Sequence, residues 1–223
     1  MATVADPRVK PAEGERRFLI PGIGWDGYQT LLGLIGDRPI RLTYDRGSVE
    51  LMSPLYGHER SKGLLGRMVE TITEELDIPM VAAGSTTFNS QALDRGLEPD
   101  ECFYLANACR LRRTDRIDLA IDPPPDLAIE VEITASALKR LVIYAALGVP
   151  EVWRFDGEIL SVLLLQPDRT YAEAATSAAF PFLPMGEIAR FLRDYEPTND
   201  TRWGRAFRAW VRDELAPRAR DVP

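Results

Sequence analysis

The sequence predicts an α/β fold, because segments of helical periodicity alternate along the chain with short apolar segments typical of strands. Residues 57–76 place their apolar side chains on one stripe of a helix, and residues 126–133 alternate polar and apolar positions as a strand does. Two turn sequences, Asp45-Arg-Gly47 and Asp156-Gly157, each separate two apolar segments and predict hairpins. These alternating elements place the chain in the α/β class.

The elements of the N-terminal half follow from spacing and from turn residues. Apolar residues at helical spacing predict a helix over residues 25–35, which the sequence Gly36-Asp-Arg-Pro39 ends. The apolar stripe of residues 57–76 contains His58, so this side chain is expected to face inward. Apolar, β-branched and aromatic residues predict strands over residues 40–44, 48–52, 80–83, 85–88 and 99–105.

In the C-terminal half, the strand over residues 126–133 is the clearest strand signal of the chain. Thr134 or Ser136 can cap a helix that follows it, and this helix is expected to end at about Leu147, with Gly148 as its stop. Further strands are expected over residues 149–155 and 159–165, and helices over residues 185–192 and 201–215.

The domain organisation is expected to be one domain with appendages, because 223 residues are too few for two independent cores of ordinary size. We expect a flexible N-terminal arm over residues 1–17, a main domain over residues 18–195 and a C-terminal helical extension over residues 196–223. Trp203 and Phe207 belong to an apolar stripe of that extension. The stripe is expected to dock on the main domain or on a second subunit.

Charge and hydrophobicity exclude several classes of protein. The chain holds 45% hydrophobic and 27% charged residues, as a folded globular protein does. Its formal charge of −7 argues against binding nucleic acid through bulk charge, but it allows a local basic groove. No run reaches the roughly 20 apolar residues of a membrane helix, and the first residues lack a signal-peptide layout. We therefore expect a cytoplasmic protein without a membrane partner.

Cysteine and histidine are scarce. Cys102 and Cys109 are the only cysteines, too few for a disulfide scaffold or a cysteine-built zinc site, which agrees with a reducing compartment. His58 is the single histidine. Any Ser-His-Asp or Cys-His catalysis would have to use it, and sites built from several histidines are excluded.

The strand over residues 126–133 carries the first sign of chemistry. Its alternation places Glu130 and Glu132 on one face, opposite an apolar face. Two carboxylates in an otherwise apolar element cost free energy unless a cation or hydrogen-bond donors satisfy them. A divalent metal ion would do so, and Asp100 at the start of a neighbouring strand could add an oxygen ligand for an ion such as Mg²⁺. A solvent-exposed strand face is the alternative interpretation of this spacing.

The order of these residues resembles a known superfamily. Pro99-Asp100, then Glu130-Val-Glu132 about 30 residues later, then a helix with a basic residue, is the pattern of PD-(D/E)XK nucleases. More narrowly, about residues 41–192 resemble a bacterial restriction-endonuclease-like family, a domain of unknown function. The segments that carry this resemblance are Met52-Ser-Pro54 with His58, Gly84-Ser-Thr-Thr87, Glu98 to Tyr104, Pro124 to Thr134 and Ile143 to Trp153.

The resemblance implies a restriction-endonuclease-like mixed sheet flanked by helices and a metal-dependent phosphodiesterase. Mg²⁺, with Mn²⁺ as a substitute, would polarise a phosphate oxygen of DNA and lower the pKa of a bound water. Asp100 matches the first acidic ligand of the family and Glu130 the second. Glu132 stands where the superfamily has lysine, so it is either a further metal ligand or the general base.

The resemblance also implies where the catalytic cation lies. The family often carries its basic residue on the next helix, four residues before a tyrosine, which corresponds to Arg140 before Tyr144. Arginine stabilises a phosphate but is a poor base, whereas the adjacent Lys139 could activate water if it is desolvated. Successive helical residues point about 100° apart, so both cannot face the site equally. His58, in a family segment, is either catalytic or a core histidine, and Tyr144 is expected to pack.

Two hypotheses follow from these residues. The first is a metal-dependent endonuclease that hydrolyses DNA phosphodiester bonds, and a homodimer would provide the two sites needed to cut both strands. Trp203 and Trp210 would supply the apolar surface for such a dimer. The second is a catalytically silent nuclease-fold module for nucleic-acid or protein interaction, which Glu132 in place of lysine and the lack of an obvious base both favour.

Overall fold

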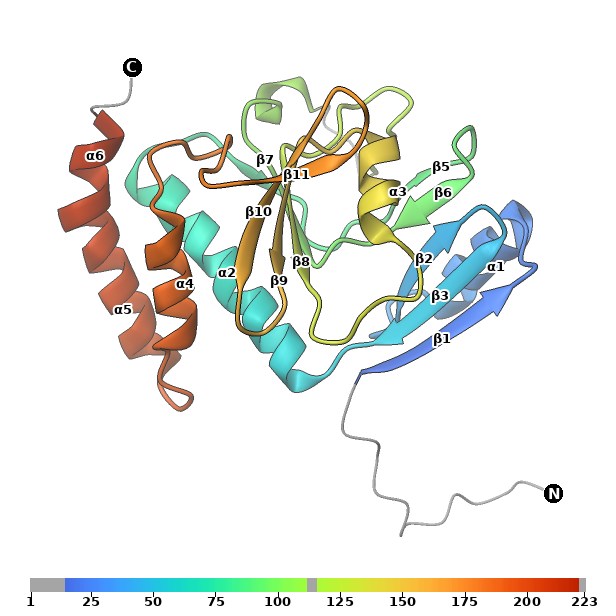
Figure 1. Ribbon diagram of the computed structural model, residues 1–223, viewed down its shortest axis with the longest axis horizontal. Coiled ribbons are helices and arrows are strands. Elements are labelled where there is room, and N and C mark those ends of the chain that lie inside the picture. The colour runs from blue at the N-terminus through green and yellow to red at the C-terminus, as the bar shows by residue number, and fades with distance from the viewer. Residues whose placement is uncertain (1–14, 112–115, 221–223) are drawn as a thin grey trace, which may run out of the picture.

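Two β-sheets and the helices that cover them make up residues 15–111 and 116–220, the part of the chain that the computed structural model describes (Figure 1). The first sheet has the order β1-β3-β2-β6-β5, and its pairs are antiparallel. Its strands are β1 (Arg16–Pro21), β2 (Arg41–Asp45), β3 (Ser48–Ser53), β5 (Phe88–Ser90) and β6 (Arg95–Leu97).

The second sheet has the order β11-β10-β9-β8-β7-β4, and only β8 and β9 pair in parallel. Its strands are β4 (Val81–Ala82), β7 (Glu101–Tyr104), β8 (Leu127–Val131), β9 (Glu151–Phe155), β10 (Leu160–Leu165) and β11 (Tyr171–Ala174). The parallel pair arises because α3 (Arg140–Leu147) connects β8 to β9 as a crossover helix.

The other helices surround the two sheets. α1 packs on the first sheet, α2 crosses one face of the second sheet, and α4 and α5 lie against α2 (Figure 1). Their bounds are α1 (Trp25–Ile35), α2 (Tyr56–Glu75), α4 (Met185–Arg193) and α5 (Asp200–Trp210), which runs through a π-helical turn (Val211–Leu215) into α6 (Ala216–Arg220); a 3₁₀ helix spans Ala108–Arg110.

Strand β8 has a buried face on each side of the sheet. Leu127, Ile129 and Val131 pack against α2, whereas Ala128 packs on the side of α3. The predicted alternation of this strand is therefore present, but Glu130 is only 6% exposed and does not lie on a solvated face. A strand buried on both faces is typical of a parallel pair covered by helices. The interpretation as an exposed strand face is thus wrong.

The α/β class and both predicted hairpins are confirmed, while several boundaries differ from expectation. β1 begins at Arg16, inside the expected arm over residues 1–17, of which residues 1–14 lie outside the described part of the chain. β6 and β11 form in segments for which the sequence predicts no strand. α3 begins at Arg140 rather than at Thr134 or Ser136, because Ser136 instead donates its hydroxyl to a carboxylate of β3.

The C-terminal helices dock on the main domain of the same chain. Trp203 and Phe207 are buried in the core formed with α2 and α4, and the indole of Trp203 donates to the carbonyl of Phe191 at 3.0 Å. Trp210 is partly buried against the same core. The apolar stripe is therefore used within the chain, so it offers no support for a dimer. Among the described helices, none combines the length and the apolar character of a membrane-spanning segment.

Candidate functional site

The site begins with a buried chain of three charged side chains around His58. Asp100 lies just before β7, and its carboxylate accepts hydrogen bonds from His58 Nε2 at 2.8 Å and from the backbone N–H of Val131 at 2.7 Å. On the other side of the ring, His58 Nδ1 lies 2.6 Å from an oxygen of Glu15. Arg41 Nε lies 3.4 Å from Asp100. His58, predicted to face inward, is fully buried between two carboxylates.

Two carboxylates on opposite ring nitrogens make His58 a buried cation. Burial alone lowers the pKa of His58, but the hydrogen bonds to Asp100 and Glu15 outweigh it and raise this pKa to about 9. Burial raises the pKa of Asp100, and His58 more than offsets this, so that the pKa of Asp100 lies below its usual range. At neutral pH, His58 is therefore protonated and Asp100 is ionised.

A second buried group joins Glu130 to α3. Arg140 donates from Nε to one oxygen of Glu130 at 2.8 Å and from a terminal nitrogen to the other oxygen at 2.5 Å. The hydroxyl of Tyr144 donates to Glu130 as well, so Tyr144 does more than the packing expected of it. Burial raises the pKa of Glu130, and the guanidinium of Arg140 only partly opposes this.

The remaining guanidinium donors of Arg140 are also used. They reach the backbone carbonyl of Glu98 at 2.7 Å and the hydroxyl of Thr43 on β2. All three nitrogens of Arg140 therefore have partners, which come from β2, β8 and the segment before β7. Arg140 thus connects the two sheets and stands beside both Glu130 and Asp100, whose charges raise its pKa despite burial.

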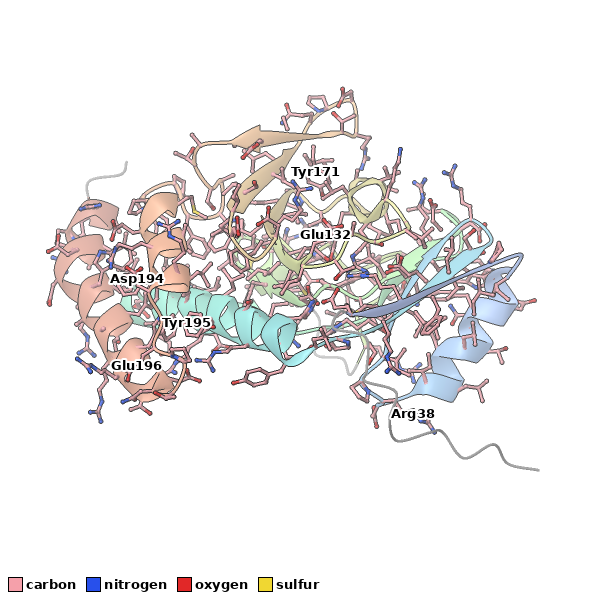
Figure 2. The ribbon with its side chains drawn as sticks, turned by 60° about the horizontal axis from the view of Figure 1, so that its bottom comes forward. Arg38, Glu132, Tyr171, Asp194, Tyr195 and Glu196 are labelled. Carbon is pink, nitrogen blue, oxygen red and sulfur yellow. The ribbon has the colours of Figure 1, made fainter. Side chains whose placement is uncertain are left out.

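A cavity of about 370 Å³ lies beside the pair of Glu130 and Arg140, and two further predicted site residues line it. Glu130, Glu132, Lys139, Arg140 and Arg154 line it. Glu132, on the segment that joins β8 to α3 (Figure 2), is half-buried and accepts the backbone N–H of Ser136 at 3.3 Å. Lys139 is exposed, just before α3. Of the two candidate cations, Arg140 is thus the one that contacts a predicted acid, Glu130.

A third carboxylate, Glu50 on β3, holds the segment before α3 in place. It accepts the Ser136 hydroxyl at 2.7 Å, the backbone N–H of Ala137 at 2.6 Å and Arg17 of β1 at 2.8 Å. Arg17 also pairs with Glu15 at 3.0 Å. Sequence reasoning missed Glu15, Arg17 and Glu50, because each of them also has a partner that lies far away in the chain.

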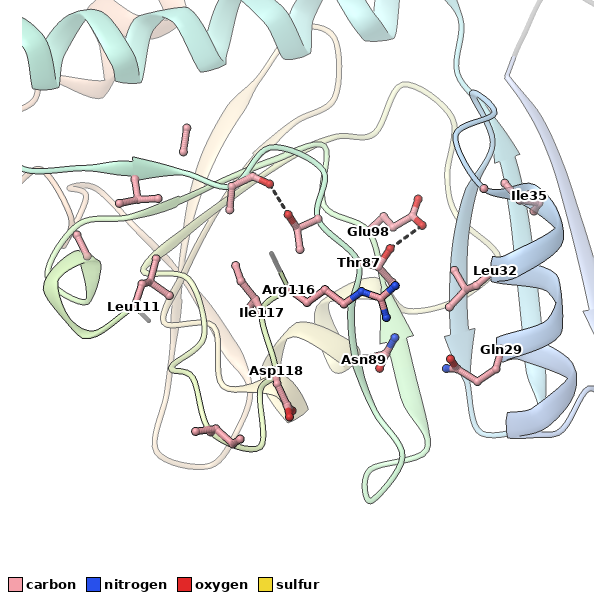
Figure 3. Close-up of a pocket in the computed structure, with 17 residues that line it drawn as sticks. Gln29, Leu32, Ile35, Thr87, Asn89, Glu98, Leu111, Arg116, Ile117 and Asp118 are labelled. Atoms are coloured by element: carbon pink, nitrogen blue, oxygen red, sulfur yellow. Dashed lines mark hydrogen bonds between the residues drawn. The ribbon is translucent and has the colours of Figure 1, made fainter. Parts of the chain in front are cut away.

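A larger cavity, of about 1240 Å³, is lined by Glu98 together with residues of α1 and of the segment before β5 (Figure 3). Gln29 and Leu32 of α1 face it, and Thr87 donates to the Glu98 carboxylate at 3.0 Å. Burial raises the pKa of Glu98. None of the predicted site residues lines this cavity, whereas the smaller one is lined by Glu130, Glu132, Lys139 and Arg140.

The expected metal site does not fit the arrangement of the side chains. Both oxygens of Asp100 and both oxygens of Glu130 already accept hydrogen bonds from protein donors. The cations His58 and Arg140 compensate the two charges at contact distance. Within the described residues, no three histidine, cysteine, aspartate or glutamate side chains are grouped as metal ligands. A divalent ion would have to displace Arg140 to reach Glu130.

Comparison with known proteins points to one family. The family model Uma2, described as putative restriction endonuclease, matches residues 25–190. No curated protein matches the chain. The matched region includes His58, Asp100, Glu130 and Arg140, whereas Glu15 and Arg17 precede it.

Proposed function

The chain belongs to the Uma2 family of putative restriction endonucleases, and from this membership we propose that it cleaves the phosphodiester backbone of DNA at the site of Asp100, Glu130 and Arg140. One observation carries the proposal. Arg140 of α3 pairs with Glu130 of β8 at the edge of a cavity, and the charge of Asp100, just before β7, acts on the same guanidinium. These are the two acids and the basic residue that the nuclease pattern of the sequence names.

Each residue has a distinct task in this proposal. His58 keeps Asp100 ionised, and Arg140 with Tyr144 fixes the orientation of Glu130. Glu132 lines the cavity and has a single backbone donor, so it is the carboxylate placed to accept a proton from an attacking water. Mg²⁺, or Mn²⁺ in its place, is the cofactor that the family resemblance implies, and its binding to Asp100 and Glu130 would require the pair between Glu130 and Arg140 to open.

The ion pair between Glu130 and Arg140 favours a second candidate function, binding without cleavage. Because Arg140 already neutralises Glu130, a nuclease-fold module that binds DNA or a protein without cleaving it agrees with the same contacts. The two functions differ in whether the site ever turns over substrate.

The test is nicking of supercoiled plasmid and cleavage of single-stranded DNA, with Mg²⁺ or Mn²⁺. We expect the wild type to be active and Glu130→Gln to lose more than about a hundredfold in rate, because it loses the carboxylate charge at the centre of the site. Glutamine keeps an oxygen that can accept from Arg140, so this variant spares the fold better than alanine does. Thermal unfolding of the wild type and of Glu130→Gln checks that the variant keeps the fold.

Two outcomes would contradict the proposal. Equal activity in the wild type and Glu130→Gln would place the chemistry elsewhere. If instead the wild type binds DNA with a steep salt dependence but never cleaves it, the second candidate function is correct.

A further inference from the structure

The cavity beside Glu130 contains an arginine that sequence reasoning did not single out. We propose that Arg154, with Lys139 at the rim, forms a subsite that binds a phosphate group. The subsite itself follows from the geometry of the cavity. Only the source of the phosphate, the DNA backbone, rests on the proposed function.

Arg140 is not available to bind a phosphate group. Its three guanidinium nitrogens donate to Glu130, to the Glu98 carbonyl and to Thr43, and its side chain is only 11% exposed. A phosphate that approached Arg140 would have to displace the carboxylate of Glu130. The cation expected from the family pattern is therefore committed within the protein, and another cation must meet the substrate.

Arg154 is placed where that second cation is needed. β8 and β9 pair in parallel with Glu130 opposite Arg154, so both side chains leave the same face of the sheet, and both line the cavity of about 370 Å³. Arg154 is half-buried and has no hydrogen bond or ion pair with any described residue. Its charge interacts with that of the exposed Asp156 without a hydrogen bond. The carboxylate of Asp156 instead accepts hydrogen bonds from backbone N–H groups of its own turn.

The other arginines near the site differ from Arg154 in this respect. Arg17, Arg41 and Arg140 each pair with a carboxylate of the network. A half-buried guanidinium loses hydration, and this cost remains until an anion binds. Each of these three arginines has a carboxylate partner within the protein. Arg154 has none among the described residues, which points to an anion from outside the chain as its partner.

The charges of the cavity favour an anion. Glu130 and Arg140 neutralise each other, which leaves Lys139 and Arg154 against Glu132 and gives 2 − 1 = +1. This local surplus contrasts with the chain's net charge of −7. The planar guanidinium fork matches the oxygens of a phosphate, and the volume lies in the range of small-ligand pockets. The subsite would thus hold a phosphate next to Glu130 and Glu132.

The test compares the wild type with Arg154→Gln and with Arg205→Gln, a control that removes the same charge from an exposed position on α5. A short labelled DNA duplex is titrated without divalent metal at several salt concentrations, and inorganic phosphate is titrated by thermal shift. We expect Arg154→Gln to weaken duplex binding about tenfold and to lower the slope of log affinity against log salt by about one. Arg205→Gln should behave as the wild type does.

Each outcome decides one point. If Arg154→Gln weakens the binding of both probes, the subsite exists and the DNA backbone can supply its phosphate. If only the thermal shift by inorganic phosphate depends on Arg154, the subsite exists but takes a free phosphate. Binding of both probes that is unchanged in Arg154→Gln overturns the subsite. Because no probe here needs cleavage, a wild type that never nicks plasmid would defeat the proposed hydrolysis without affecting this result.

Discussion

Replacing Arg140 with alanine is expected to lower the free energy of unfolding by about 3 to 5 kcal/mol, because it leaves the carboxylate of Glu130 buried without its cation. Urea denaturation measures this loss. The matched control is Arg190→Ala, which removes the same kind of side chain from an exposed pair with Glu187 on α4. That pair is 42% and 37% exposed, so its loss should cost less than about 1 kcal/mol.

The same variant should gain affinity for metal. In Arg140→Ala, the charges of Asp100 and Glu130 lose the guanidinium beside them, and oxygen ligands for a divalent ion become accessible. Mn²⁺ is therefore expected to raise the temperature of thermal unfolding more in Arg140→Ala than in the wild type. The double variant Arg140→Ala/Glu130→Gln should lose the gain. An equal response of all three proteins would show that Arg140 does not keep metal from this site.

Those parts of the fold that depend on local signals could be predicted from the sequence. The turn over Asp45 to Gly47 has positive φ at Arg46 and Gly47, as a tight hairpin turn requires, and the hairpin forms there. α1 spans the predicted residues 25–35, because spacing and a glycine stop agree. The alternation of β8 likewise placed Glu130 opposite the apolar face that packs on α2.

The rest of the candidate site depends on contacts between distant parts of the chain. Glu15 reaches His58 across 43 residues, and Glu50 reaches Ala137 across 87 residues. β1 has mostly exposed side chains at a sheet edge, so no hydrophobic pattern marks it as a strand. Arg154 follows a tryptophan in an ordinary strand pattern, and only the parallel register of β8 and β9 brings it opposite Glu130.

The choice between Lys139 and Arg140 shows how the position of a helix boundary decides which cation contacts Glu130. A helix that began at Thr134 would have carried both residues at helical spacing. Because Glu50 holds Ser136 and Ala137 in an irregular segment, α3 begins only at Arg140. Arg140 then turns toward Glu130, and Lys139 stays exposed at the rim of the cavity.

The second large effect expected is a loss of stability at alkaline pH that depends on His58. The pKa of His58 is raised from 6.5 to about 9 in the folded protein, so its ion pairs stabilise the fold fully below pH 6.5, and this stability disappears as the pH rises through 9. The pKa values of Asp100 and Glu15 are lowered, so their contribution disappears instead as the medium becomes acidic. Stability that depends on this network should therefore be greatest in mildly acidic solution.

A pKa raised from 6.5 to about 9 corresponds to about 3 kcal/mol, which sets the expected fall in the free energy of unfolding between mildly acidic and strongly alkaline solution. Urea denaturation across this range measures the fall in the wild type and in His58→Gln. The variant starts from a lower stability, because Asp100 and Glu15 lose their shared cation, so the comparison uses the change with pH and not the absolute value. If His58→Gln loses as much stability at alkaline pH as the wild type does, the buried histidine is neutral, and Asp100 relies on Arg41 and the backbone N–H of Val131 for its charge.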